Sequence, residues 1–271
     1  MKIAIYHNNN EQTLAVTKQL TTLLKQHHLV IDNDHPDLVI TVGGDGTLLG
    51  AFHHYEHCVD QISFVGIHTG HLGFYTDWRG YEVATLVDKI ATMQPQLVAY
   101  PLLKGVITYA DGSPNDEFLA LNESSLKRLS ETLRIDVYIS GEFFESFRGD
   151  GLCVSTPTGS TAYNKSVGGA VLHPKLETLQ MAEVASINNL VYRTLSAPIV
   201  IAPDDWIDLR PEVADDYVIT VDEFANNNRP LQQIHYEIAK ERIHFARYRT
   251  HRFWDRVEGA FIGSKEHNNE I

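Results

Sequence analysis

Cysteine, cationic side chains and long apolar runs are all scarce in this 271-residue sequence. Its two cysteines, Cys58 and Cys153, lie far apart in apolar surroundings, which favours reduced thiols over a disulfide framework. Lys and Arg number 22 against 35 Asp and Glu, and a net charge of −13 repels polyanions, so we expect no nucleic-acid partner. No run approaches the roughly 18 apolar residues that span a bilayer. Because residues 1–10 also lack the charged and then apolar pattern of a signal segment, we expect a cytoplasmic protein with no membrane partner.

What is present indicates a globular chain. The hydrophobic content of 43% is enough for substantial cores, and the length indicates about two domains. The first hundred residues alternate between β-rich apolar segments and segments with helical apolar spacing. We expect strands at 2–6, 37–42 and 62–67, each followed by a helix, the last of them around 83–90. Three successive strand–helix units predict a Rossmann-like three-layer α/β domain with a parallel sheet over residues 1–100.

The pattern changes after residue 100. Short strand signals separated by turn residues replace long helices, which predicts an antiparallel, β-sandwich-like domain over residues 101–252. Residues 253–262 have helical spacing, and we expect the polar tail at 264–271 to fray. The strands expected in this all-β domain are 102–109, 118–121, 133–139, 199–202, 217–221 and 234–238.

The second expected strand ends in Gly43, Gly44, Asp45, Gly46 and Thr47. Consecutive glycines let a backbone approach a diphosphate closely, and the following helix N-terminus offers free N–H groups, so this turn predicts phosphate binding. It is neither a Walker A loop, because no Lys-Ser/Thr pair ends it, nor the dinucleotide fingerprint, because the third glycine is missing. An aspartate among such amides suits proton acceptance or help in holding Mg²⁺. The alternative, that Asp45 caps the helix, stays open.

A second polar segment runs from residue 155 to 166 and begins with five hydroxyl side chains within seven residues. Pro157 and Gly159 turn the chain, and a helical segment follows, so small hydrogen-bond donors gather at a helix start, where a polar ligand can bind. An ordinary capped Ser/Thr loop is the open alternative. Two weaker signals are the charged turn at 148–151 and the polar pair at 122–123, which ends an apolar strand.

Fourteen histidines raise the question of a metal site. His53 and His57 are four apart on one expected helix face, beside Cys58, but Glu56 does not directly follow the first histidine and no third ligand is indicated. We therefore expect a solvated polar face and no metal ligand from these side chains. A hydrolase triad is excluded because no Gly-x-Ser-x-Gly elbow is present.

Taken together, these segments resemble the bacterial NAD kinase family, and the resemblance covers nearly the whole chain. The turn at 43–47 has relatives in lipid kinases and phosphofructokinases, whereas the Thr-Pro-Thr-Gly-Ser-Thr-Ala-Tyr run at 156–163 selects NAD kinase. The resemblance implies phosphorylation of the adenosine-ribose 2′-hydroxyl of NAD to give NADP, with ATP as donor and Mg²⁺ or a similar divalent ion as cofactor. It leaves open whether polyphosphate also serves as donor. It further implies a homodimer or homotetramer, and a C-terminal segment, 253–271, that returns to the α/β domain.

Individual roles follow from the family motifs in the same way. Asp45 is implied to accept the proton of the 2′-hydroxyl, and Arg148 and Asp150 match positions that in relatives reach NAD across a subunit contact. The chain departs from many relatives at Glu223, which follows Asp222 where glycine is common, so a ligand contact there is left open. The residues implied to bind NAD or ATP are Gly44, Gly46, Thr47, Phe74, Asn122, Glu123, Arg148, Asp150, Thr158, Ser160, Thr161, Ala162, Tyr163, Asn164, Lys165, Ser166 and Ala185.

Two other functions use parts of the same pattern. A lipid kinase would need a membrane-facing apolar or basic surface, and this acidic chain has no amphipathic basic helix to provide one. A non-catalytic dinucleotide sensor would bind NAD through the same loops, but a pure phosphate-binding loop gains nothing from the negative charge of Asp45. We therefore expect an enzyme, a phosphotransferase with an alcohol acceptor.

Overall fold

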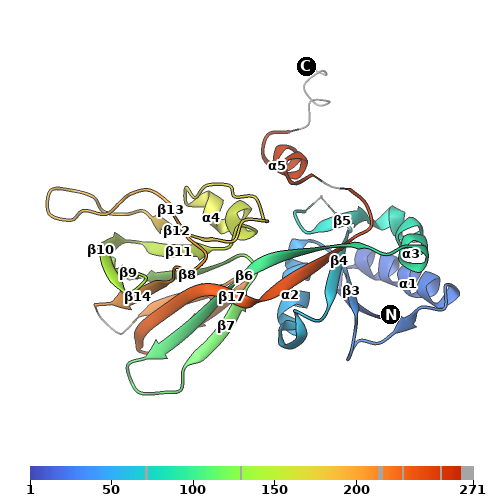
Figure 1. The fold of residues 1–271 in the computed structure, drawn as a ribbon, viewed down its shortest axis with the longest axis horizontal. Helices are drawn as coiled ribbons and strands as arrows, with labels where there is room; N and C mark the ends of the chain where they lie inside the picture. The colour runs from blue at the N-terminus through green and yellow to red at the C-terminus, as the bar shows by residue number, and fades with distance from the viewer. Residues whose placement is uncertain (71–72, 129, 213–215, 228, 251, 264–271) are drawn as a thin grey trace. The chain divides into compact units, whose positions relative to one another are not determined.

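The computed structural model describes residues 1–70, 73–128, 130–212, 216–227, 229–250 and 252–263 (Figure 1). The chain forms two compact units. Unit 1 contains Met1–Ala99 and Ile243–Ile271, and unit 2 contains Tyr100–Arg242. Residues 243–252 differ from the expected domain bounds, because they belong to unit 1. The fraying expected at 264–271 concerns residues outside the described part of the chain.

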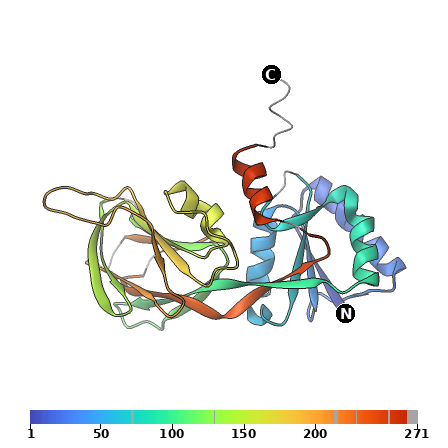
Figure 2. The same ribbon diagram turned by 45° about the horizontal axis from the view of Figure 1, so that its top comes forward.

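The strands and helices of unit 1 alternate along the chain. They are β1 (Lys2–His7), α1 (Glu11–Gln26), β2 (Val30–Ile31), β3 (Leu38–Val42), α2 (Asp45–His54), η1 (Glu56–Cys58), β4 (Ser63–His68), β5 (Thr76–Arg79), η2 (Gly80–Glu82) and α3 (Val83–Thr92), then the end of β17 (Leu231–Arg247) and α5 (Phe253–Phe261). The parallel sheet has the order β2–β1–β3–β4, and both β5 and the end of β17 pair with β4. The connections β1–α1–β2 and β3–α2–β4 cross the sheet in opposite directions. Because such crossovers are right-handed, α1 and α2 lie on opposite faces (Figure 2), which confirms the predicted three-layer α/β arrangement.

Local sequence explains these elements. All five residues of β3 are buried, as expected of a parallel strand covered on both faces. α1 begins after Asn10, whose side chain accepts a hydrogen bond from the amide of Thr13 at 2.8 Å, and Leu20 and Leu24 of its inner face join the core. The carboxyl ends of β1, β3, β4 and β5 lie at one edge of the sheet, which is where such sheets bind ligands.

Two features of unit 1 differ from the sequence-based expectation. The short strands β2 and β5 were not predicted, because two and four residues are too few to show a period. α2 ends at His54, and His57 lies in η1, so His53 and His57 do not share a helix face. The prediction of one helix across both histidines is therefore wrong. Both cysteines, Cys58 and Cys153, are free thiols, as expected.

Unit 2 consists of two antiparallel sheets. The first is ordered β13 (Ile199–Ile201), β12 (Leu179–Val184), β11 (Gly151–Ser155), β8 (Glu123–Arg128), β15 (Tyr217–Val221) and β16 (Phe224–Asn227). The second is ordered β10 (Glu142–Gly149), β9 (Leu133–Ile139), β14 (Ile207–Pro211), β17, β6 (Gln96–Tyr109) and β7 (Asp116–Ala120). Leu103 and Phe147 of one sheet and Val154 and Met181 of the other share a single core, which confirms the predicted β-sandwich.

Several strands of unit 2 were not predicted: β8, β10, β11, β12, β14 and β16. In β8 the hydroxyls of Ser124 and Ser125 are buried and bond the hydroxyls of Tyr236 (3.0 Å) and Thr220 (2.6 Å). Their burial is thus made tolerable by partners that lie about a hundred residues away in the chain. Within the described residues, no helix is long and apolar enough to cross a membrane.

Candidate active site

The turn between β3 and α2 holds the glycines that the sequence singled out. Gly43 has a φ of +154° and donates its amide to the carbonyl of Ile67 at 2.9 Å. A Cβ at this position would lie 2.1 Å from Oγ1 of Thr47, so only glycine fits. Gly44 is the N-cap of α2, and a Cβ placed there meets nothing within 4 Å. The backbone at Gly44 is therefore open to a close approach from outside.

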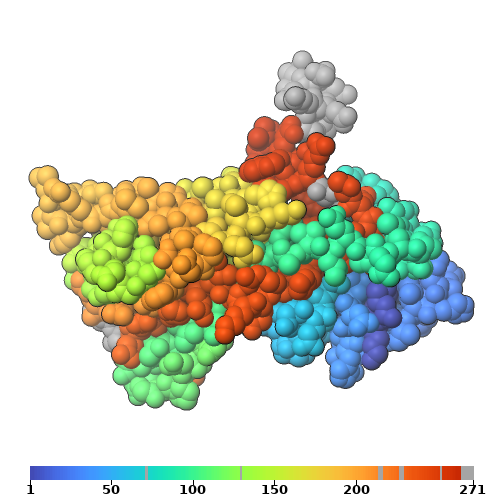
Figure 3. All heavy atoms as spheres, viewed as in Figure 1, coloured from blue at the N-terminus to red at the C-terminus, as the bar shows by residue number. Residues whose placement is uncertain are grey.

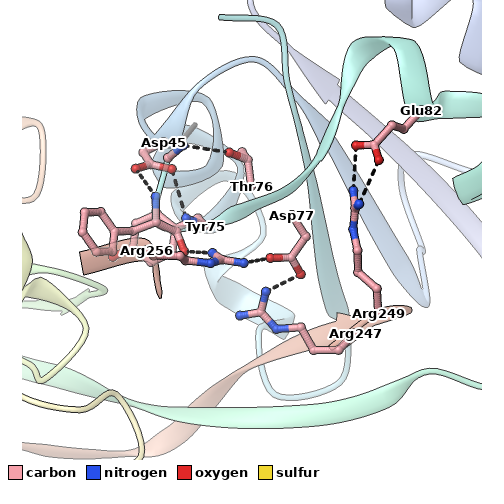
Figure 4. Close-up of polar contacts among 10 residues, drawn as sticks. Asp45, Tyr75, Thr76, Asp77, Glu82, Arg247, Arg249 and Arg256 are labelled. Carbon is pink, nitrogen blue, oxygen red and sulfur yellow. Dashed lines mark hydrogen bonds and ion pairs between the residues drawn. The ribbon is translucent and has the colours of Figure 1, made fainter. Parts of the chain in front are cut away.

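Asp45 is the first residue of α2, and its carboxylate is fixed by a neighbouring turn. The amides of Phe74 and Tyr75 donate to its two oxygens at 2.8 Å and 3.1 Å (Figure 4). A Cβ at Gly73 would lie 2.1 Å from Oδ1 of Asp45, so the turn of residues 73–75 packs directly on the carboxylate. Because the N-cap is Gly44, Asp45 does not cap the helix, which was the alternative that the sequence left open. Its carboxylate instead stands at the carboxyl edge of the sheet in one defined orientation.

A buried ion cluster that the sequence analysis missed lies behind this turn. Asp77 of β5 is 4% exposed and pairs with Arg247 and with Arg256 of α5. The guanidinium of Arg256 also donates to the carbonyl of Phe74. Burial lowers the pKa of Arg256 to about 10, so it remains cationic at neutral pH. The sequence signal that could have indicated it is a single arginine within the apolar spacing of α5.

In unit 2, the pair Asn122 and Glu123 is held by the carboxylate of Asp222. This carboxylate accepts the amides of Leu121, Asn122 and Glu123 at 3.0, 2.7 and 3.2 Å. Asp222 itself has a φ of +50°. The sequence left its role open, and the structure places it as a brace for the chain that carries the polar pair.

Glu123 occupies an unusual environment for a carboxyl group. It is 7% exposed, and its Oε2 has no hydrogen-bond partner among the described residues. Burial raises the pKa of Glu123 to about 8, and the negative charge of Asp222 adds to this while Lys127 opposes it. At pH 7 the carboxyl group thus carries a proton and can donate a hydrogen bond.

The hydroxyl-rich segment of residues 155–166 packs against the chain at residues 121–122. The hydroxyl of Thr156 donates to the carbonyl of Leu121 at 2.6 Å and accepts the amide of Gly159 at 2.9 Å. A Cβ at Gly159 would lie 2.0 Å from the carbonyl oxygen of Asn122. The structure therefore brings together two segments that the sequence separates by more than thirty residues.

The side chains of this segment differ in accessibility. Ser160 is fully buried, and its hydroxyl donates to the carbonyl of Pro157 (2.6 Å) and accepts the amide of Leu172 (2.8 Å), so it holds the turn together. Asn164 is also fully buried, and Thr158 is 5% exposed. The segment contains η3 (Gly159–Thr161) and α4 (Tyr163–Ser166). Its residues with accessible surface are Thr161, Ala162, Tyr163, Lys165 and Ser166.

Arg148, Asp150 and Ala185 lie at the other end of β11. The amide of Asp150 donates to the carbonyl of Val184 at 3.0 Å, next to Ala185, which has a φ of +48°. The guanidinium of Arg148 stacks over the ring of Tyr192 at 4.0 Å. Since β11 is five residues long, this group is separated from the segment at 156–166 by roughly 17 Å of extended strand. It therefore forms a second cluster, apart from Asn122 and Glu123.

The donor atoms at the glycine turn suit one mode of magnesium binding, in which the protein supplies few of the ligands. Mg²⁺ usually takes one or two carboxylates and fills its remaining positions with substrate phosphates and water. The Asp45 carboxylate beside open glycine backbone fits that mode. Within the described ranges of the chain, no group of three or more His, Cys, Asp or Glu side chains is placed to hold a metal ion. A cation would thus depend on the phosphates of a bound nucleotide.

Comparisons with known proteins agree with this arrangement. Residues 3–94 match the ATP-NAD kinase N-terminal domain family, and residues 120–247 match the ATP-NAD kinase C-terminal domain family. The NAD kinase of Lacticaseibacillus paracasei is 59% identical over 98% of this chain and all of its own length. That of Enterococcus faecalis is 55% identical over 97% of this chain and 99% of its own length.

Solved structures share the fold at much lower identity. A yeast NADH kinase, solved with NADH, superposes with a TM-score of 0.82 at 18% identity and covers 98% of this chain and 88% of its own. An NAD kinase from Archaeoglobus fulgidus, solved with ATP, gives a TM-score of 0.74 at 19% identity and covers 97% of this chain and 100% of its own. The family matches span most of the sequence, and the related chains align from end to end. The chain therefore belongs to the NAD kinase family.

Proposed function

We infer that this protein is a cytoplasmic NAD kinase, which transfers the terminal phosphate of ATP to the 2′-hydroxyl of the adenosine ribose of NAD and releases NADP. The observation that carries the inference is the Asp45 carboxylate, fixed by two backbone amides beside the open backbone of Gly44. A turn that only bound phosphate would gain nothing from a negative charge at this point. A carboxylate there serves a reaction in which a hydroxyl loses its proton.

Asp45 is the proton acceptor in this proposal. Phosphoryl transfer depends mainly on alignment of the attacking and leaving oxygens and on neutralisation of charge. Gly44, Gly46 and Thr47 hold the phosphates, and Asp45 takes the proton of the ribose hydroxyl as the new P–O bond forms. A positioned base of this kind contributes about 10²- to 10⁴-fold to the rate. A bound Mg²⁺ would supply neutralisation of the phosphate charge, and Asp45 is the carboxylate of this turn that would help to hold it.

In this proposal the residues of unit 2 bind the dinucleotide. Phe74 of unit 1 stays a predicted binding residue from the family resemblance. Asn122 and the protonated Glu123 supply hydrogen bonds, and the accessible residues of the 156–166 segment line the substrate. Ser160 and Asn164 act from behind, by shaping the turn. The cluster of Arg148, Asp150 and Ala185 lies apart from these groups along β11 and belongs to the site of a second copy, in a homodimer or homotetramer.

A coupled assay tests the function. Purified protein is incubated with NAD, ATP and Mg²⁺, and NADP is detected with an NADP-specific dehydrogenase, beside an Asp45→Asn variant. We expect NADP from the parent and a loss of turnover of about 10²-fold or more in the variant, with NAD affinity nearly unchanged. No NADP from folded protein that still binds NAD would contradict the kinase assignment and favour a dinucleotide sensor. Near-normal turnover by the variant would remove the base role of Asp45.

A further inference from the structure

Helix α5 is attached to unit 1 in an unusual way. Of its nine residues, all of them described, Arg256 is the one that is buried, with 7% exposure. A terminal helix normally docks through an apolar stripe. Here the buried contact is an ion pair between Arg256 and Asp77, and Asp77 is shared with Arg247 (Figure 4). Removing two charges from water costs free energy that their attraction often only offsets, so a buried ion pair adds little to stability. The burial of Arg256 therefore calls for a functional reason.

The same guanidinium reaches the turn that holds Asp45. Its second nitrogen donates to the carbonyl of Phe74, while the amide of Phe74 donates to Oδ2 of Asp45 at 2.8 Å. The next amide, that of Tyr75, donates to Oδ1 at 3.1 Å. One residue thus lies between the cation on α5 and the carboxylate on α2. The ring of Phe261 adds a second contact to the same turn, 5.6 Å from that of Phe74 between ring centroids.

We propose that Arg256 is a positioning residue for phosphoryl transfer: it clamps the turn of residues 73–75 from behind, so that the two amides of the turn hold the Asp45 carboxylate in the orientation that accepts the ribose proton. Asp77 orients the guanidinium. Because both bonds of the turn, one to Arg256 and one to Asp45, involve Phe74, a shift of the turn moves the carboxylate with it. The inference rests on the proposed role of Asp45 as the base.

Two methionine substitutions test it. Arg256→Met keeps much of the side-chain volume and removes the donors and the charge. Arg249→Met is the matched control: Arg249 forms two hydrogen bonds to Glu82, both 2.8 Å, and stacks over Trp78 at 3.7 Å, in the same unit. Among the described residues its contacts do not include the 73–75 turn. Both variants lose a charged pair, but only Arg256→Met loosens the turn.

The measurements are kcat, KM for NAD and the melting temperature of each variant. We expect Arg256→Met to lower kcat by about 10- to 100-fold, since small displacements of a reacting group have effects of this size. Because Phe74 belongs to the turn and is also a predicted NAD contact, KM for NAD should rise by a smaller factor than kcat falls. Arg249→Met should lower the melting temperature and keep kcat within about two-fold. If Arg256→Met does not fold, Arg256→Lys keeps a charge beside Asp77 without the planar fork, and a drop in kcat larger than the change in KM is expected again.

A kcat for the folded Arg256 variant within about two-fold of the parent would overturn the proposal, as would an equal loss of kcat in the Arg249 control. The double variant Asp45→Asn with Arg256→Met adds a further criterion: it should be no slower than Asp45→Asn alone, because the clamp acts through Asp45. The failure of the proposed function is a separate result. In that case the parent makes no NADP. If instead the parent is active, Asp45→Asn is slow and Arg256→Met is as fast as the parent, only the clamp is contradicted.

Discussion

Three carboxyl groups, one in unit 1 and two in unit 2, have different surroundings, which suit them to different roles. That of Asp45 accepts two amides and stays accessible, which suits a base. That of Asp222 accepts three amides and braces the chain at 121–123. That of Glu123 is buried, and one of its oxygens lacks a partner among the described residues. The residue type alone does not distinguish these roles, because they depend on burial and on which amides point at the oxygens.

Glu123 makes stability depend on pH in a defined direction. Below its ordinary pKa of 4.5 the carboxyl group is protonated in both the folded and the unfolded chain. Between pH 4.5 and about 8 the carboxyl group is protonated in the folded chain but ionised in the unfolded chain. Unfolding therefore releases a proton, and the free energy of unfolding falls as pH rises. Above about pH 8 the group is ionised in both states, and the fall ends. Glu123→Gln should remove this decline, raising the melting temperature at pH 8 and leaving it unchanged near pH 4.

Melting curves of the parent and of Glu123→Gln across pH 4–9 measure the effect. Several pKa units correspond to a few kcal/mol, at about 1.4 kcal/mol per unit, which is large enough to see. Glu117→Gln is the control, because Glu117 is an exposed glutamate of the same unit, and its curve should run parallel to that of the parent. Parallel curves for Glu123→Gln as well would show that the buried carboxyl group does not retain its proton.

At the scale of elements, the junction of β3 and α2 combines one glycine required by the fold with one that leaves room for a ligand. Gly43 is required because a Cβ would collide with Thr47, 2.1 Å away. Gly44 faces open space and has a φ of −100°, which any residue can adopt. We therefore expect the two neighbours to separate folding, which needs Gly43, from the proposed phosphate binding at Gly44.

Alanine at each position makes this separation measurable. Gly44→Ala should fold as the parent does and raise KM for ATP by about 10-fold, because a methyl group keeps the phosphate away from the amides. KM for NAD should change little. Gly43→Ala should lower the melting temperature or the yield of folded protein. An unchanged KM for ATP in Gly44→Ala would mean that the phosphates do not approach the backbone there.

At the scale of the whole molecule, an exposed apolar patch accompanies the cluster of Arg148, Asp150 and Ala185. The segment between β12 and β13, gold in Figure 3, stands out from unit 2 and carries Leu190, 92% exposed, and Val191, 77% exposed. Apolar side chains this exposed next to one another are typical of surfaces that contact another protein. A second copy of the chain is the occupant that the family resemblance implies.

Sedimentation velocity measures this self-association. The parent should sediment as a dimer or tetramer, and Leu190→Glu combined with Val191→Glu should shift it towards smaller species, because burying two charges in an apolar contact is unfavourable. NADP formation should fall in parallel if a second copy completes each site. A parent that sediments as a monomer at micromolar concentration would contradict the proposed assembly.

The sequence by itself determined the layout of unit 1 and the identity of the candidate base. Strand and helix periods are local, so the strands ending at Tyr6, Val42 and Ile67 could be recognised, and each ends within a residue of its observed position. The glycine turn with Asp45 could be recognised for the same reason, because five adjacent residues carry the whole signal. The sandwich of unit 2 was predicted as a class, but β8 and β11 were not, since their burial depends on partners elsewhere in the chain.

Only the tertiary structure decided what surrounds the reactive groups. Asp222 braces the chain at Asn122 from a hundred residues away, and Arg256 meets Asp77 from an even greater separation. No local pattern encodes such pairs, because each partner alone resembles an ordinary surface charge. The energy of a buried charge depends on its burial and on the partner that folding brings to it, so the raised pKa of Glu123 and the proposed clamp at Arg256 arise only in the folded chain.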